Sequence, residues 1–174
     1  MKTEPFLMGG TCPECGKGQL FLIYESEEFD YELGDEKLRV KVENVPLEKC
    51  DQCGEVIAGT SAFRLRHDAI CRTAGFYTPS EIRELRENLG LSQTEFAQLA
   101  GVGTATVSRW ERGRLLQNRG NDNLLFLLTL ESNRKLLQER AASRTNSNLP
   151  TPSKTDTAQL PPFASLAPTE TTVE

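Results

Sequence analysis

Two stretches near the start of the chain place apolar residues at alternating positions, such as Phe21 and Ile23, which is the pattern of half-buried β-strands. They are QLFLIYE at residues 19–25 and KLRVKVENVPLEKC at residues 37–50. Successive side chains of a strand point to opposite faces, so Val40 and Val42 would bury one face of the second strand. The stretch between the two is polar and contains glycine. The pattern therefore predicts a β-hairpin closed by a polar loop.

The middle of the chain predicts three helices with marked ends. Residues 61–72 repeat apolar residues at helical spacing, and Gly75 would end this connecting helix. Each of the next two helices begins at a capping box, in which a hydroxyl residue and a glutamate three positions later satisfy each other's backbone N–H groups. The two boxes are Thr78 with Glu81, around Pro79, and Ser92 with Glu95. Glycines at positions 90 and 101 predict the ends of these helices.

Residues 121–140 contain leucines too densely spaced for a single apolar stripe. We therefore predict a helix that is covered on more than one side, and a second subunit would provide that cover. From Ala141 onward, 16 of 34 residues are Ser, Thr or Pro, and no periodicity remains. Residues 141–174 are accordingly predicted to be a disordered tail.

These elements predict an α+β chain in four parts. The parts are a small β-rich domain at 1–60, a connecting helix and hinge at 61–78, an all-helical domain at 79–140, and the tail at 141–174. A β-rich domain of about 60 residues buries too little apolar surface to be stable alone, so it needs a bound metal or disulfides to stabilise it.

The net charge of −5 is unevenly distributed along the chain. Residues 1–58 carry 13 acidic and 6 basic residues, a balance of −7, whereas residues 103–120 carry four arginines and one glutamate, a balance of +3. The acidic part favours a basic macromolecule and the basic part favours phosphate. No run approaches the roughly 18 apolar residues that span a bilayer, and the start lacks the long apolar stretch of a signal peptide. We therefore expect a soluble, cytoplasmic protein without a membrane partner.

Four of the five cysteines form two CxxC motifs, CPECG at residues 12–16 and CDQCG at residues 50–54. Each motif lets two sulfurs point at one centre, and two motifs complete a tetrahedron. The predicted ligands are Cys12, Cys15, Cys50 and Cys53. Four thiolates without a carboxylate or histidine favour Zn²⁺, and such a closed site is structural because no position stays open for water. We predict one zinc ion per chain, with the hairpin bringing the second motif back to the first.

Other uses of these thiols are less consistent with the sequence. Disulfides are disfavoured in a reducing compartment, and five cysteines would leave one unpaired. A thioredoxin-like pair requires one CxxC at a helix start in a βαβ unit, which this chain does not provide. Iron at the same four sulfurs remains an alternative to zinc. Cys71 is interpreted as a small apolar residue of the connecting helix and His67 as a helix-surface residue.

The sequence offers few side chains that could act as a catalytic acid, base or nucleophile. The chain has one histidine, no nucleophile motif and no glycine-rich phosphate loop. A closed metal site adds no Lewis acid, so we do not expect an enzyme.

The stretch LSQTEFAQLAGVGTATVSRWERGR, residues 91–114, predicts a helix-turn-helix. Apolar residues of both helices would face a shared core, and Gly101 would permit the turn between them. Outward-facing side chains on the second helix would then meet the major groove of DNA. They are Thr104, Ala105, Ser108 and Arg109. An arginine can bond bidentately to guanine, whereas Arg112, Arg114 and Arg119 are better placed for phosphates.

Residues 92–113 resemble the helix-turn-helix of the Xre/Cro family of repressors. The matching positions are Gln93, Ala97, Gly101, Val107 and Trp110 to Gly113. Joined to the CxxC…CxxC domain, the chain resembles over about residues 10–140 the MqsA antitoxin family, whose zinc domain is of the YgiT type. This resemblance implies that the C-terminal domain dimerises and binds operator DNA, and that the zinc domain contacts an RNA-cleaving toxin.

The resemblance also implies roles for single residues. It places Arg109 where an arginine reads bases, and Gln93 where a phosphate is held at a helix N-terminus. Ala105 stands where the resembling antitoxin has a base-reading asparagine, so the operator sequence does not transfer. The full set of predicted DNA contacts is Gln93, Thr104, Ala105, Thr106, Ser108, Arg109, Arg112 and Arg114.

Two hypotheses for function follow. The first is an antitoxin and autorepressor, whose zinc domain binds a basic toxin and whose homodimeric helix-turn-helix domain binds palindromic double-stranded operator DNA. The alternative is a stand-alone zinc-containing transcription regulator without a toxin, in which the thiolates respond to metal or oxidant.

Overall fold

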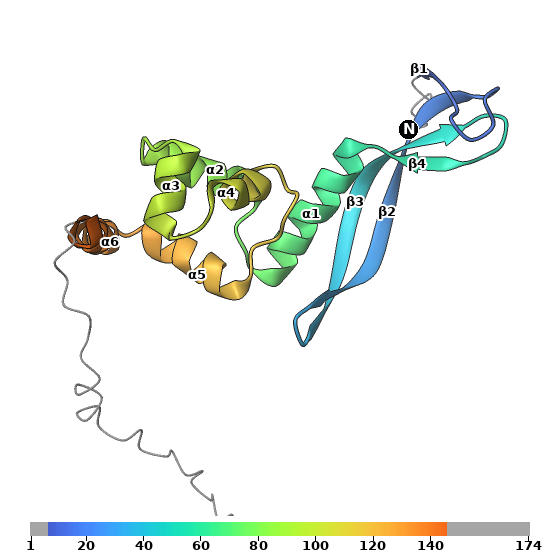
Figure 1. The fold of residues 1–174 in the computed structure, drawn as a ribbon. Coiled ribbons are helices and arrows are strands. Elements are labelled where there is room, and N and C mark those ends of the chain that lie inside the picture. The colour runs from blue at the N-terminus through green and yellow to red at the C-terminus, as the bar shows by residue number, and fades with distance from the viewer. Residues whose placement is uncertain (1–6, 146–174) are drawn as a thin grey trace, which may run out of the picture.

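The computed structural model describes residues 7–145 of the chain (Figure 1). A β-sheet with one helix alongside it forms one end of the molecule, a cluster of four helices follows, and a last helix lies at the other end. This α+β arrangement confirms the predicted fold class. Within the described part of the chain, none of the helices is both long enough and apolar enough to cross a bilayer.

The sheet is antiparallel, with its four strands in the order β1-β2-β3-β4. The strands are β1 (Leu7–Thr11), β2 (Gln19–Leu33), β3 (Glu36–Cys50) and β4 (Val56–Ala58). The predicted hairpin is β2 with β3. Its strands continue through the stretch predicted as a loop, so only Gly34 and Asp35 form the turn, with Gly34 at φ +62°. In that stretch charged and apolar residues alternate along the strand. Arg39 bonds to Glu28 at 2.7 Å and to Asp30 at 2.9 Å on the neighbouring strand.

Helix α1 (Thr60–Ala74) packs on β3, and together they bury the core of this end of the molecule. The buried members are Val40, Val42, Val45, Leu47 and Ala62. A bidentate ion pair from Arg66 to Glu27, with N to O distances of 2.6 and 2.7 Å, fastens α1 to β2 as well. The helix ends at Gly75, which has φ +70°, as the sequence predicts.

The hinge that follows α1 is held in place by buried polar groups. The backbone N–H of Tyr77 donates to Asp122 Oδ1 at 2.8 Å, and Gln117 Nε2 donates to the Tyr77 carbonyl at 2.6 Å. Gln117 and Asp122 are themselves buried. The hinge is therefore anchored to the helical end of the chain, because Asp122 and Gln117 bind the backbone N–H and the carbonyl of Tyr77.

Five helices make up the rest of the described chain: α2 (Pro79–Asn88), α3 (Gln93–Ala100), α4 (Thr104–Glu111), α5 (Arg119–Leu128) and α6 (Glu131–Thr145). Both predicted capping boxes are present at the starts of α2 and α3. Their core is a single cluster of apolar side chains from α2 to α5. Its fully buried members include Ile82, Phe96, Val107, Trp110, Leu125 and Leu128.

The stretch predicted as one helix over residues 121–140 is two helices, separated at Thr129 and Leu130. Arg134 caps the end of α5, since its Nη1 donates to the carbonyls of Leu128 and Thr129 at 2.8 Å each. These bonds satisfy carbonyls at the end of α5 that would otherwise need the next helical turn.

Helix α6 extends to Thr145, so its last five residues lie in the predicted tail. Ala141 and Ala142 are strong helix formers, and no proline interrupts the chain before Pro150. The remainder of the predicted tail, residues 146–174, lies outside the described residues.

Candidate metal centre and nucleic-acid interface

The four predicted cysteine ligands converge between the start of β2 and the end of β3. The Sγ atoms of Cys12 and Cys53 are 3.8 Å apart, and those of Cys15 and Cys50 are 3.7 Å apart. All four sulfurs lie within 4.8 Å of one another. Zinc–sulfur bonds of about 2.3 Å in a tetrahedron require sulfur separations of about 3.8 Å. The four thiols therefore match the geometry of a closed metal site.

The backbone of both motifs is shaped to present these sulfurs. The N–H groups of Gly16 and Gly54 donate to the carbonyls of Cys12 and Cys50, and both glycines have positive φ, +64° and +75°. Each motif thus turns tightly enough for its two sulfurs to share a centre. Backbone N–H groups also donate to sulfur, from Gly18 to Cys15 Sγ and from Gln52 to Cys50 Sγ, each at 3.4 Å.

Gly18 is part of this centre, although the sequence pattern did not identify it. A Cβ at position 18 would collide with Cys50 Sγ and would lie 2.8 Å from Asp51 Oδ1. The same Asp51 oxygen accepts the backbone N–H of Gln19 at 2.9 Å, which joins the second motif to the first strand of the hairpin. Only a residue without a side chain allows the two motifs to approach this closely.

The thiols differ in their readiness to ionise. Backbone N–H donation from Gly18 lowers the pKa of Cys15 to about 6, and donation from Cys53 lowers the pKa of Cys50. The Glu55 N–H favours the Cys53 thiolate, but the neighbouring sulfurs and burial oppose it, and its pKa rises to about 12. Without a metal the cluster therefore keeps protons that a bound cation would displace.

The predicted helix-turn-helix is α3 with α4. The turn between them contains Gly101 at φ +68°, and Val107 and Trp110 of α4 are buried behind the outer face of the helix. On that outer face Thr104, Ala105 and Arg109 are exposed, while Thr106 and Ser108 are half-buried. Arg112 and Arg114, just after α4, are exposed. The structure thus brings the predicted DNA contacts of α4 together on one surface.

Gln93 and Arg119 have partners that the sequence did not indicate. Gln93 Nε2 donates to Glu111 Oε2 at 2.8 Å, so this amide joins the start of α3 to the end of α4. Arg119 donates to Glu36 at 2.7 Å and lies over the ring of Phe76 at 5.6 Å. This ion pair links α5 to the tip of the hairpin. It also gives the Arg119 guanidinium, which the sequence predicted to contact phosphates, a partner within the chain.

Comparison with known proteins identifies one family whose model matches most of the chain. The model of the family described as the antitoxin component of bacterial toxin-antitoxin system, MqsA, matches residues 10–140. The matched range contains both CxxC motifs, α1 and the helix-turn-helix. A search of curated proteins found no match.

Proposed function

The chain belongs to the MqsA antitoxin family, and we propose from this premise that it is a non-enzymatic antitoxin that also represses its own operon. The proposed division of labour follows the predicted domains. Residues 1–60 hold a structural zinc ion and bind the toxin, and residues 79–140 dimerise and bind operator DNA. Residues 61–78 connect these two domains and orient them. Residues 141–174 are proposed to be a disordered tail.

The exposed face of α4 is the observation that carries the DNA-binding part. Arg109 is exposed on this face, directly beside Trp110, whose indole is buried and holds the helix to its core. An arginine held in this way can bond to O6 and N7 of guanine in the major groove. Arg112 and Arg114 extend the positive surface beyond the helix, where phosphates of the groove wall would lie.

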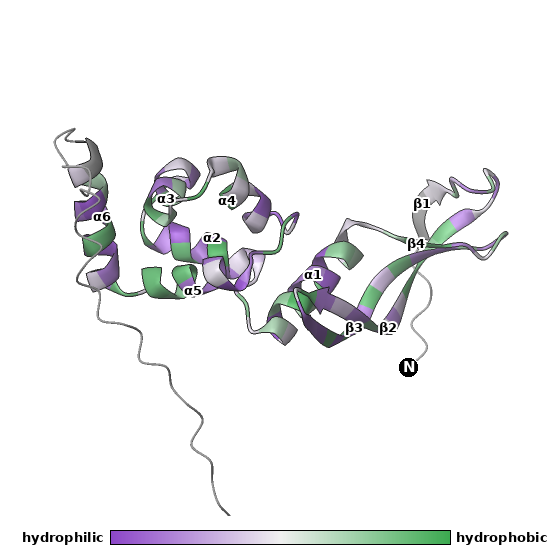
Figure 2. Ribbon diagram, turned by 60° about the horizontal axis from the view of Figure 1, so that its bottom comes forward, coloured by the Kyte–Doolittle hydropathy of each residue, from purple (hydrophilic) through white to green (hydrophobic). Residues whose placement is uncertain are grey.

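Exposed apolar side chains on α5 and α6 support dimerisation. Phe126 is 58% exposed and Leu136 is 63% exposed, and Leu127 and Leu130 are exposed between them. Figure 2 shows these hydrophobic segments at the end of the molecule away from the sheet. A second copy would cover this surface, and the two recognition helices would then lie about 34 Å apart, one turn of DNA.

The charge of the sheet supports a basic toxin as the partner of the N-terminal part. Residues 1–58 carry the balance of −7, and a protein that cleaves RNA needs a basic surface. When bound, zinc would hold the two CxxC motifs together and so fix the orientation of β2 and β3. The chain's own residues provide the surface that recognises the partner.

Co-expression with the product of the adjacent gene tests this proposal. We expect a small basic protein to co-purify with the full chain, and the complex to retain binding to the upstream DNA of the operon. The matched control is a variant with Cys50→Ser, which removes one ligand and should reduce capture of the partner while operator binding persists. Absence of any partner, together with normal DNA binding, would favour a regulator without a toxin.

The alternative regulator is favoured by one observation, the exposure of Cys53. An exposed sulfur is accessible to oxidants, and its oxidation would release a bound metal. Zinc release at physiological peroxide doses, with matching loss of operator binding, would support this second function.

A further inference from the structure

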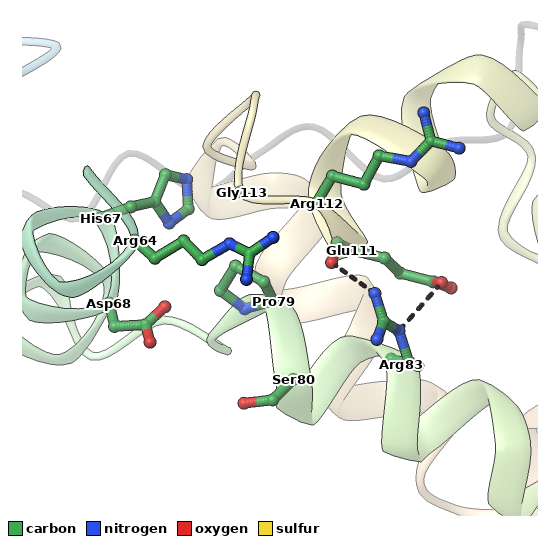
Figure 3. A pocket seen from close by; sticks show the side chains of 9 residues that line it. All are labelled: Arg64, His67, Asp68, Pro79, Ser80, Arg83, Glu111, Arg112 and Gly113. Atoms are coloured by element: carbon green, nitrogen blue, oxygen red, sulfur yellow. Dashed lines mark hydrogen bonds and ion pairs between the residues drawn. The ribbon is translucent and has the colours of Figure 1, made fainter. Parts of the chain in front are cut away.

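A hollow of about 220 Å³ lies between α1 and the helical cluster, outside the metal centre. Its walls come from α1, from the start of α2 and from the turn after α4 (Figure 3). The Arg64 side chain extends from α1 over Pro79, and Arg83 lies on α2. Arg112 lies at the rim, next to Gly113. Three arginines from separate elements thus line one hollow.

A second hollow of similar volume, about 220 Å³, shares part of this wall. Arg64, Arg112 and Gly113 line both, and Arg114 lines the second alone. The two hollows share this wall, and their basic residues come from both sides of the hinge. Within residues 7–145, no acidic residue lines the second hollow.

Of the two acids that line the first hollow, Glu111 compensates Arg83, and neither forms an ion pair with Arg64 or Arg112 among the described residues. Glu111 is buried and receives Arg86 at 2.6 Å, while Arg83 lies 3.6 Å from its carboxylate and donates to its backbone carbonyl at 3.0 Å. Asp68 lies on the α1 wall, away from Arg112 (Figure 3). Among residues 7–145, Arg64 and Arg112 form no ion pair, so their charges are available to an anion.

His67 forms a neutral wall of the hollow and is half-buried, so it is more enclosed than the sequence interpretation of a helix-surface residue implied. Its Nε2 is buried without a hydrogen bond in the described structure, and its Nδ1 lies 3.5 Å from Cys71 Sγ. Burial lowers the pKa of the ring despite the nearby Asp68 carboxylate and Leu115 carbonyl. The positive charge of the site therefore comes from the arginines.

We propose that this hollow is a binding site for one phosphate group, held by Arg64 and Arg112 at the rim and by Arg83 beneath. A tetrahedral oxyanion accepts N–H groups from several directions at once, which suits arginines from separate elements better than a planar carboxylate does. Because Arg64 belongs to α1 and the other two belong to the helical cluster, the bound group bridges the two sides of the hinge. The phosphate is either a free anion or a phosphate of operator DNA, and the DNA source rests on the proposed function.

The first arm of the test uses the full, zinc-loaded chain and inorganic phosphate. Phosphate should raise the melting temperature above that in chloride at equal ionic strength. The Arg64→Ala and Arg112→Ala variants should lose this rise, and Arg64→Lys should keep part of it. Asp68→Asn should enlarge it, because a repelling carboxylate is removed. Arg72→Ala is the matched control, since Arg72 is exposed on the same helix but does not line the hollow.

The second arm measures DNA binding as a function of salt. Arg64→Ala should lower the slope of log K against log salt by about one and weaken operator and unrelated DNA equally. A lost phosphate response alone assigns the site to a free anion, and a reduced slope alone assigns it to the DNA backbone. If neither changes in Arg64→Ala, the proposal is overturned. If the wild-type chain binds no DNA, the proposed function fails and the phosphate arm still decides this site.

Discussion

The carboxylate of Glu111 receives both Nε and Nη2 of Arg86, at 2.6 and 3.1 Å, in a site where the Glu111 side chain is only 1% exposed. Gln93 Nε2 completes the arrangement at 2.8 Å. One acid at the end of α4 thereby holds α2 and the start of α3, and these bonds set the angle at which α4 presents its outer face.

Replacing Glu111 by alanine should destabilise the helical part strongly. Arg86 would remain mostly buried without its partner, and breaking such a pair costs about 3 kcal/mol of unfolding free energy. Urea denaturation followed by circular dichroism measures the loss. The matched control is Glu87→Ala, which removes an exposed partner 3.2 Å from the same arginine and should cost less than about 0.5 kcal/mol. Equal losses in both variants would contradict the central role of Glu111.

The same pair predicts a pH dependence. Burial raises the pKa of Glu111, but hydrogen bonds from Arg86 and Gln93 lower it more, so the folded value lies below the ordinary 4.5. A depressed folded pKa gives stabilisation that is complete above 4.5 and is lost as the pH falls through the folded value. The urea midpoint should therefore decline below about pH 4.5 in the wild type, and less so in Glu111→Gln. Parallel declines in both proteins would assign the effect to other carboxylates.

Gly18→Ala should weaken zinc binding at least tenfold, an effect typical of residues that support metal ligands. The added methyl would displace Cys50 Sγ from the position it shares with the other three sulfurs. Competition with a chromogenic chelator measures the affinity. Gly10→Ala is the control, because a Cβ there meets only Leu20 Cδ1 at 4.0 Å. Unchanged affinity in Gly18→Ala would show that the motifs can separate without losing the metal.

Arg109→Ala should reduce sequence discrimination more than general DNA affinity. A bidentate contact with guanine contributes about 1 to 3 kcal/mol of discrimination. Competition between operator and unrelated DNA measures it. Arg114→Ala should instead weaken both complexes alike, because a phosphate contact carries no sequence information. Retention of full operator preference by Arg109→Ala would mean that another residue reads the bases.

Phe126→Glu should convert a dimer into a monomer, because a charge at the centre of a buried apolar contact is strongly unfavourable. Sedimentation velocity gives the oligomeric state. Tyr24→Glu is matched in exposure, 59% against 58% for Phe126, but lies on β2 and should leave the dimer intact. A monomeric wild type, or a dimer that survives Phe126→Glu, would place the subunit contact elsewhere.

Much of the local structure could be predicted because its causes lie within a few residues. The CxxC spacing brought together Cys12, Cys15, Cys50 and Cys53 as expected. The capping boxes at Thr78 and Ser92 mark the true starts of α2 and α3. The length of the hairpin was underestimated, since its strands are stabilised by Arg39 bridging two acids of the opposite strand, a contact that the polarity of a single stretch does not reveal.

The sequence by itself determined the α+β class, the four-cysteine cluster and the helix-turn-helix, because thiol spacing, caps and apolar periodicity act locally. Only the tertiary structure decided which distant residues meet. It paired Gln93 with Glu111, placed Gly18 against Cys50, and gathered Arg64, Arg83 and Arg112 around one hollow. These relationships join residues far apart in the chain, so they depend on how the sheet, α1 and the helical cluster pack, which no short stretch of sequence encodes.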